Sequence, residues 1–204
     1  MKSRTTIVGV ISGLSLLVVA GTASANLIQN GNFESGNIDF SSGYEYTSDP
    51  GGLATGGEGG GAGRYGVGTS ANFFHSAFTT AGDHTSGSGN MMVVNGSGDA
   101  TKTVWEGTVV PPLSSGQTYQ FSAWAMNVYP DSPANLQFSF GGNTLGSLTP
   151  SGNGVWQQFT ATFVATGNQS SGLVDLNIAS FGNDFALDDI SLTAVPDGAS
   201  FLCL

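Results

Sequence analysis

The chain has 204 residues, room for one domain with a real hydrophobic core, and 14 acidic residues face only 4 basic ones. Charged residues make up 9% of the chain and Gly occurs 32 times, while 13 Phe and 3 Trp argue against a disordered chain. Because so acidic a surface repels phosphate backbones and anionic lipids, the composition argues against nucleic-acid binding.

Residues 1–25 have the three parts of a secretory signal peptide. Lys2 and Arg4 precede an apolar run over 7–20, and an Ala-Ser-Ala sequence at 23–25 provides a small-residue cleavage site. The apolar run is short for a membrane-spanning helix, which is the alternative interpretation. We therefore expect this segment to be removed during secretion.

The mature chain expected after cleavage begins at Asn26 and keeps Arg64 and Lys102 as its only basic residues. Cys203 is the only cysteine, so no disulfide framework is possible. A secreted chain without disulfides fits a bacterial cell envelope or an extracellular location.

The first part of the mature chain is rich in turn residues. A short apolar start over 26–40 contains a turn at Asn30 and Gly31, and residues 50–63 form a Gly-rich loop. Such a loop serves either as a simple connection or as a mobile rim over a ligand-binding face.

The rest of the chain is typical of β-strands separated by turns, and it shows no helical period. Short apolar or alternating runs predict strands over residues 91–94, 102–110, 118–128, 135–140, 154–165, 173–179 and 185–195. Strands at this spacing predict an all-β fold over 26–194, an antiparallel β-sandwich of the jelly-roll, galactose-binding-domain-like type.

Aromatic residues on these strands are candidates for stacking on sugar rings. The strand over 118–128 places its more apolar face, with Tyr119, Phe121, Ala123 and Ala125, opposite Gln120, Ser122, Trp124 and Met126. Trp105 likewise lies opposite Val104 in its strand. The ligand-binding candidates are therefore Trp124, Trp105 and Gln120, although a Trp in a sandwich strand also serves as core.

Three stretches together resemble a known group. The sequence NLIQNGNFESG at 26–36 resembles the opening strand of jelly-roll carbohydrate-binding modules of the family 4/9/22 type. FALDDISL at 185–192 resembles the last strand of these modules and of MAM domains, and GDHTSGSGNMMVV at 82–94 is similar to a MAM motif. The resemblance spans most of 26–194, lacks the MAM cysteines, and implies a sugar-binding jelly roll in which Trp156 is structural.

The tail AVPDGAS at 194–200 resembles the VPD-type sorting signals of exosortase substrates, the PEP-CTERM class. Such tails continue into an apolar helix and a basic cluster, whereas this sequence ends shortly afterwards at Leu204. Residues 195–204 are thus expected to be the remnant of a sorting signal, with membrane attachment only through a missing or truncated anchor. Alternatively, a Pro-Asp-Gly turn simply ends the domain.

Asp188 and Asp189 stand inside an apolar strand, where an unpartnered buried carboxylate costs several kcal/mol. The resemblance implies a structural calcium ion bound by Glu34 and by Asp189, or Asp188 in another register. It adds the carbonyl of Asn32, and one from the loop over 83–89, as further ligands. Ca²⁺ suits such mixed oxygen shells. Alternation leaves one of the two Asp side chains pointing inward unless a bulge intervenes, and solvent or backbone N–H groups are the alternative partners.

Few residues suggest catalysis. The chain has no G-x-S-x-G elbow, its two histidines form no known metal motif, and no pair of Glu residues stands in an acid–base motif. Asp83 is expected to cap a turn, and His84 to pack against a neighbouring strand. Two functions remain: non-catalytic binding of an extracellular glycan or polysaccharide, or a structural or adhesive role in a matrix, biofilm or cell surface with no small-molecule site.

Overall fold

The computed structural model of the protein describes residues 24–167, 170–179 and 182–196. Most of the expected signal peptide (1–23) and of the expected sorting tail (197–204) therefore lies outside the described residues. Within the described ranges, no helix has the length and apolar character needed to cross a membrane.

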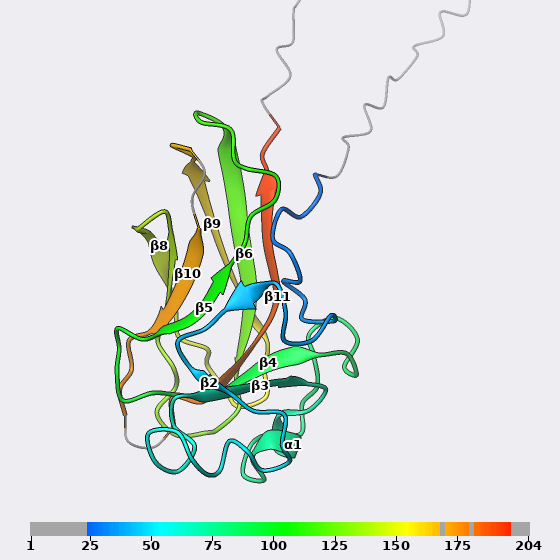
Figure 1. The fold of residues 1–204 in the computed structure, drawn as a ribbon, viewed down its shortest axis with the longest axis vertical. Coiled ribbons are helices and arrows are strands. Elements are labelled where there is room, and N and C mark those ends of the chain that lie inside the picture. Colours follow the sequence, from blue (N-terminus) through cyan, green and yellow to red (C-terminus); the bar gives the residue numbers. More distant parts are fainter. Residues whose placement is uncertain (1–23, 168–169, 180–181, 197–204) are drawn as a thin grey trace, which may run out of the picture.

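The chain folds into two β-sheets packed face to face, which confirms the predicted sandwich (Figure 1). The first sheet has five strands, all antiparallel to their neighbours. In spatial order these are β1 (Phe40–Ser41), β5 (Thr103–Gly107), β10 (Ser171–Asp175), β7 (Leu136–Phe140) and β8 (Asn143–Leu148).

The second sheet has six strands and carries the site described below. In spatial order they are β2 (Glu45–Tyr46), β3 (Arg64–Gly68), β4 (Met91–Asn95), β11 (Phe185–Ala194), β6 (Thr118–Asn127) and β9 (Gln157–Val164). Only the β2–β3 pair is parallel among the described pairs of this sheet. Most of the predicted strands thus exist with ends shifted by a few residues.

The main core lies between the two sheets. Phe121 of β6 points into it together with its neighbours on the face predicted to be apolar, Tyr119, Ala123 and Ala125. Phe138 of the opposite sheet stacks on Phe159, with ring centroids 4.4 Å apart and an interplanar angle of 11°. Each fully buried Phe side chain contributes about 1.5–3 kcal/mol through the area removed from water.

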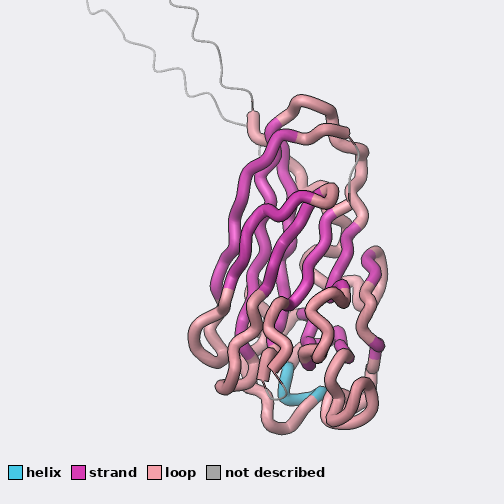
Figure 2. Tube along the Cα trace, turned by 90° about the vertical axis from the view of Figure 1, so that its left-hand side faces the viewer, coloured by secondary structure: helices cyan, strands magenta, loops and turns pink. Residues whose placement is uncertain are grey.

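A second apolar cluster lies on the outer face of the six-stranded sheet. Phe74 of the one-turn helix α1 (Ala71–Phe74) and Phe78 pack there against Met91, Val93 and Met126. Figure 2 shows the loops and α1 gathered at one end of the long strands. The loops therefore cover one end of this outer face, and the other end stays open.

Strand β3 was not predicted, because its sequence RYGVG contains two glycines. The packing of Phe74 requires at least one of them: a Cβ atom on Gly66 would lie 2.4 Å from Phe74 Cε1. Glycine weakens the strand pattern in sequence, yet here it allows a ring to approach the backbone closely. The edge strand β8 was missed as well.

The N-terminal segment runs beside the last strand, β11. Leu27 N donates to Leu192 O at 2.8 Å, and Ile190 N donates to Gly31 O at 2.8 Å. A Cβ atom on Gly31 would lie 2.0 Å from Ile190 O, so this close approach depends on glycine. The segment lies along β11, from which the two Asp carboxylates project.

Candidate functional site

A β-bulge explains how β11 accommodates two adjacent carboxylates. Asp188 pairs with Trp124 of β6, but the next pair joins Ser191 to Ser122, so β11 contains an additional residue. Asp189 takes a left-handed φ of 45° within this bulge. Simple alternation does not apply there, and both carboxylates contact the loop formed by residues 82–90.

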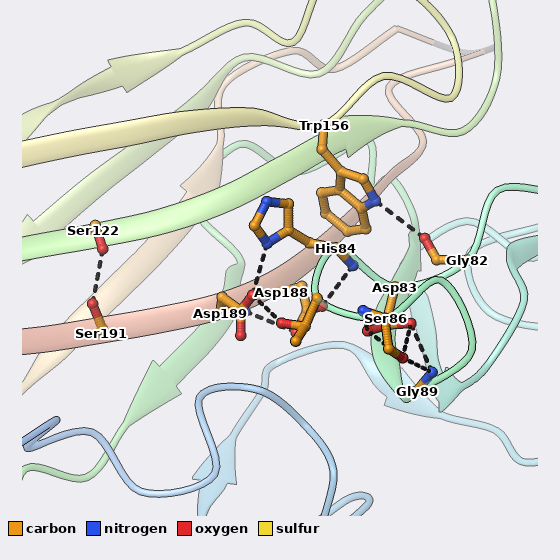
Figure 3. A network of polar contacts seen from close by, with 11 residues as sticks. Gly82, Asp83, His84, Ser86, Gly89, Ser122, Trp156, Asp188, Asp189 and Ser191 are labelled. Carbon is orange, nitrogen blue, oxygen red and sulfur yellow. Dashed lines mark hydrogen bonds and ion pairs between the residues drawn. The ribbon is translucent and has the colours of Figure 1, made fainter.

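The two carboxylates hold this loop through His84 (Figure 3). Asp188 Oδ2 accepts the backbone N–H of His84 at 2.9 Å, and Asp189 Oδ2 lies 2.7 Å from His84 Nδ1. Asp188 Oδ1 also accepts the backbone N–H of Asp189 at 2.8 Å. Backbone N–H groups thus supply the partners that the sequence analysis gave as an alternative to a metal ion.

Asp83 caps the turn of the same loop, as predicted. Its carboxylate accepts the N–H groups of Ser86 at 2.9 Å and of Gly89 at 2.6 Å, together with the Ser86 hydroxyl. Burial alone would raise the pKa of Asp83, but these hydrogen bonds outweigh it and hold that pKa below its ordinary value.

Glu34 reaches the same loop from the N-terminal segment. Its Oε1 accepts the N–H of Asn90 at 2.9 Å. A Cβ atom on Gly89 would lie 2.1 Å from Glu34 Oε1 and 3.1 Å from Asp83 Oδ2. The carboxylates of Glu34 and Asp83 therefore flank one point of the backbone, in a space that only glycine leaves open.

No lysine or arginine of the described residues pairs with these carboxylates, because Arg64 pairs with Glu45 at 3.1 Å and Lys102 with Glu58 at 2.6 Å. Burial raises the pKa of Asp188 to about 7, although the N–H groups bonded to its carboxylate lower that pKa. The negative charges of Asp189 and Asp83 add to the rise. The described part of the chain contains no group of three His, Cys, Asp or Glu side chains placed to share a metal ion.

These donors fit Ca²⁺ in chemistry, since they are hard oxygen ligands for which no described lysine or arginine competes. Carboxylates alone would not complete the six to eight oxygens that Ca²⁺ takes, so backbone carbonyls would have to contribute. Asp188 is buried and accepts backbone N–H groups at both oxygens, whereas Asp189 contacts His84 and Thr85 through Oδ2 alone, which leaves Asp189 Oδ1 as the more available oxygen.

The His84 ring packs between two tryptophans. It stacks on Trp124 with ring centroids 3.7 Å apart and an interplanar angle of 19°, and it meets Trp156 edge-on at 6.0 Å. Trp156 donates its indole N–H to Gly82 O at 3.1 Å and packs against the second apolar cluster. The predictions that His84 packs on a neighbouring strand and that Trp156 is structural are confirmed.

Trp105 corrects the sequence analysis. Its side chain is only 1% exposed and belongs to the core between the sheets. A bulge in β5 skips Val104 in the pairing with β10, so Val104 and Trp105 are both buried. Trp105 packs over Gly107 on the core side of β5 and offers no surface to a ligand.

Gln120 is exposed on the same outer face as Trp124 but lies four residues along β6. At about 3.4 Å per residue this separation is about 14 Å. Gln120 lines a different hollow, beside Thr193 and Pro196. The two side chains therefore share a face and could contact only an extended ligand together.

A groove of about 430 Å³ lies between the N-terminal segment and the outer face of β6, β9 and β11. Trp124 lines it, and Gln158 of β9 stands directly opposite Trp124 in the strand pairing. Its other lining residues are mostly small or polar: Asn26, Ile28, Asn30, Gly31, Asn32, Ser122, Asp189, Ile190 and Ser191.

Some of these polar groups are engaged within the protein and others are available to a ligand. Asn26 bonds to the backbone of β11, and the hydroxyls of Ser122 and Ser191 lie 2.8 Å apart. Within the described residues, the Gln158 amide has no hydrogen-bond partner, and neither does the Asn32 amide nitrogen. The groove therefore presents amides and an aromatic ring, which suit a polyhydroxylated ligand.

Gln158 and the contribution of the N-terminal segment to the groove were not predicted from the sequence. A signal for Gln158 exists in the alternation of WQQFTATF, where Phe159, Ala161 and Phe163 pack toward the core. That alternation turns Gln158 outward. Its position opposite Trp124 depends on the pairing of β6 with β9, which the local sequence does not reveal.

The chain was compared with protein families, with curated proteins and with solved structures. The model of a family described as carbohydrate binding domain matches residues 25–180. No curated protein matches the chain.

Solved structures resemble the fold at low sequence identity. The CBM22-1 xylan-binding domain from Paenibacillus barcinonensis Xyn10C is 13% identical, with a TM-score of 0.50 over 87% of this chain and 99% of that domain. The tandem CBM22-1–CBM22-2 domain of the same protein gives 13% identity and a TM-score of 0.51 over 91% of this chain and 50% of that one. The sugar-binding EclA C-terminal domain is 23% identical, with a TM-score of 0.37 over 40% of this chain and 60% of its own length.

Proposed function

The chain belongs to the carbohydrate binding domain family, and on that premise we propose that it binds an extracellular glycan or polysaccharide without acting on it. The binding surface proposed here is the groove lined by Trp124 and Gln158. The observation that carries this proposal is their placement opposite each other on adjacent strands, beside the Asn32 amide nitrogen, which has no hydrogen-bond partner among the described residues.

The groups in the groove favour binding over hydrolysis. Glycoside hydrolysis uses two carboxyl groups flanking the scissile bond, one as acid and the other as base or nucleophile. Asp188 is 1% exposed and holds the loop over 82–90, and Asp189 is bound to His84 and Thr85. Amides and hydroxyls, which hold a sugar in place, make up most of the remaining polar lining.

A calcium ion is a further part of the proposal. Glu34 and Asp189, or Asp188, with the carbonyl of Asn32, would hold it where the N-terminal segment, the loop over 82–90 and β11 meet. Bound Ca²⁺ would supply positive charge to a cluster of carboxylates that pairs with no lysine or arginine in the part of the chain that the structure describes. Its role would be structural, because it would join three segments beside the groove.

Secretion is proposed from residues 1–25, whose sequence has the form of a signal peptide. Expression in a bacterial host should deliver the protein outside the cytoplasm, and N-terminal sequencing should begin at Asn26. A product that begins at Met1 and stays in the cytoplasm would contradict this part of the proposal.

Affinity gel electrophoresis tests the glycan-binding proposal. The full chain is run through gels that contain xylan, β-1,4-galactan, cellulose derivatives or mannan, and at least one polymer should retard it. Trp124→Ala should migrate as if no polymer were present. Phe73→Ala is the matched control, because Phe73 is an exposed aromatic residue (49%) that does not line the groove.

Retardation that is equal for both variants would exclude the groove as the binding surface. If none of the polymers retards the wild type, the proposal fails and a structural or adhesive role becomes the better account.

A further inference from the structure

A second cavity, of about 620 Å³, lies at the loop-covered end of the sandwich and shares no lining residue with the groove. It is bounded by the Gly-rich loop near Glu58, by the segment that follows α1, and by the turn after β4. Two residues preceding β11, Asn183 and Asp184, form part of its wall. The Gly-rich loop thus borders a cavity, which is the second of the two roles considered for it.

Asp184 presents an unpartnered carboxylate oxygen to this cavity. The residue is only 6% exposed, and its Oδ1 accepts the backbone N–H of Gly96 at 3.1 Å. No described residue donates a hydrogen bond to Oδ2. Oδ2 is also not fully buried, so part of it is exposed. Because Asp184 lines the cavity, its small exposed part faces that cavity. A buried carboxylate in this position needs a donor from a ligand or from water.

Two further groups in the cavity are free to bond. His75 Nδ1 accepts the N–H of Ala77 at 3.1 Å, so the neutral ring carries its proton on Nε2. Burial lowers the pKa of His75, which favours this neutral form. In the part of the chain that the structure describes, neither His75 Nε2 nor the Tyr129 hydroxyl has a hydrogen-bond partner. The cavity therefore offers an acceptor, a donor and a hydroxyl.

Apolar surface lies beside these polar groups. Phe78 stacks on His75 with ring centroids 4.6 Å apart and an interplanar angle of 17°. Ile178, which is 57% exposed, forms another part of the lining. A flat apolar ligand face with hydroxyls at its edge would match this combination, and a sugar ring has that character.

The charges in the cavity select among sugars. Glu58 is neutralised by Lys102 at 2.6 Å and accepts bonds from Ser97 and Gly98, so Asp184 is the uncompensated charge among the lining residues. An acidic sugar would be repelled. A simple amine would pair with Asp184 but would leave the His75 N–H without an acceptor.

We propose that this cavity binds the terminal residue of a neutral glycan, with Asp184 accepting from a sugar hydroxyl and His75 and Tyr129 bonding to neighbouring oxygens. The inference rests on the proposed glycan binding, because the ligand is of the same class. It nevertheless uses different residues, so one site can fail without the other. A polymer would lie along the groove, whereas the cavity would receive a chain end or a single sugar.

The only two histidines of the chain report on the two sites separately. His75 lines the cavity and His84 stacks on Trp124 beside the groove. The full chain, labelled with ¹³C-histidine, is titrated with glucose, galactose, mannose and xylose while the ring C–H signals are recorded. At least one sugar should shift the His75 signal to saturation and leave the His84 signal in place.

Asp184→Asn should weaken that binding by at least about tenfold, because it removes the charge from the acceptor. The change keeps the shape of the side chain and an oxygen for the Gly96 N–H, and thermal unfolding checks the fold. Tyr129→Phe should give a smaller loss. Asp49→Asn is the matched control, an exposed carboxylate that does not line the cavity.

The proposal is overturned if none of the four sugars shifts the His75 signal, or if Asp184→Asn binds as tightly as the wild type. Trp124→Ala separates the two sites, since it should lose polymer retardation and keep the His75 response. Polymer binding without a His75 response rejects the cavity alone. A His75 response without polymer binding rejects the groove alone.

Discussion

Trp105 and Trp124 both stand in alternating strands, yet they belong to two different regions of the molecule. Trp105 lies in the core between the sheets with 1% exposure. Trp124 lies on the outer face of β6, half-buried under His84 and bordering a groove. Alternation tells which residues share a face, but the partner sheet and the covering loops decide which face becomes core.

On the outer face of the six-stranded sheet, covering loops decide the burial of residues within a single strand. Met126 and Trp124 point to the same side of β6, but the loop-covered end buries Met126 in the second apolar cluster. Trp124 marks the boundary at which this cover ends. The bulge at Asp189 lies opposite this boundary and holds the loop over 82–90 in place.

The largest expected effect comes from truncating the two tryptophans. Trp105→Ala should lower the free energy of unfolding by about 3–5 kcal/mol, because it leaves a large cavity in the core. Trp124→Ala should cost about 1 kcal/mol, since its ring is only partly packed. Urea denaturation of both variants measures the difference. Equal losses would mean that Trp124 is a core residue and that the groove is incidental.

Calcium should stabilise the region around Trp124 more than the core. At a concentration 100 times its Kd, Ca²⁺ would add about 2.7 kcal/mol to the free energy of unfolding. Thermal unfolding with Ca²⁺ and then with EGTA should show this as a reversible change in Tm, and Glu34→Ala should abolish it. An unchanged Tm would indicate that backbone N–H groups alone satisfy Asp188 and Asp83.

Asp188→Ala should lower stability by about 2 kcal/mol, because it leaves the buried N–H groups of His84 and Asp189 without their acceptor. Asp189→Ala should cost less, since Asp189 is more exposed and bonds to side chains. Chemical denaturation in the presence of EGTA keeps this comparison independent of calcium. A larger loss for Asp189→Ala would reverse the roles assigned to the two residues.

Asp184 should make stability depend on pH. Burial raises its pKa to about 7, and the charge of Asp175 adds to the rise, so the folded state binds a proton that the unfolded state releases. This contribution is complete at low pH and is lost as pH rises through about 7. Between pH 5 and pH 8 the loss amounts to about 2.6 kcal/mol.

Asp184→Asn should remove this share of the pH dependence in urea denaturation at pH 5 and pH 8. Glu58 lines the same cavity, but it is already neutralised by Lys102. The lowered pKa of His75 makes stability rise with pH, and the raised pKa of Asp188 makes stability fall with pH, as Asp184 does. The test therefore compares the pH dependence of stability in the variant with that in the wild type. Identical pH profiles would contradict the raised pKa assigned to the buried Asp184 carboxyl.

Much of the fold could be predicted from the sequence, because local patterns determine strands and turns. Alternation identified the inward face of β6, and the Gly- and Ser-rich stretch after Asp83 predicted the capped turn. The candidate site was predictable only in part, since it depends on contacts between distant segments. Gln158 lies opposite Trp124 only because β6 pairs with β9, and His84 contacts Asp189, which is 105 positions away in the sequence. The two glycines of β3 weaken its strand pattern, although β3 packs against Phe74.

Isothermal titration calorimetry with an oligosaccharide cut from the polymer that retards the protein in gels shows whether Trp124 contributes to glycan binding. We expect saturable binding by the wild type and a Kd at least about tenfold higher for Trp124→Ala, a loss of about 1.4 kcal/mol. An unchanged Kd in this variant, with Trp124 removed from the groove, would contradict the claim that the open end of the six-stranded sheet binds the glycan.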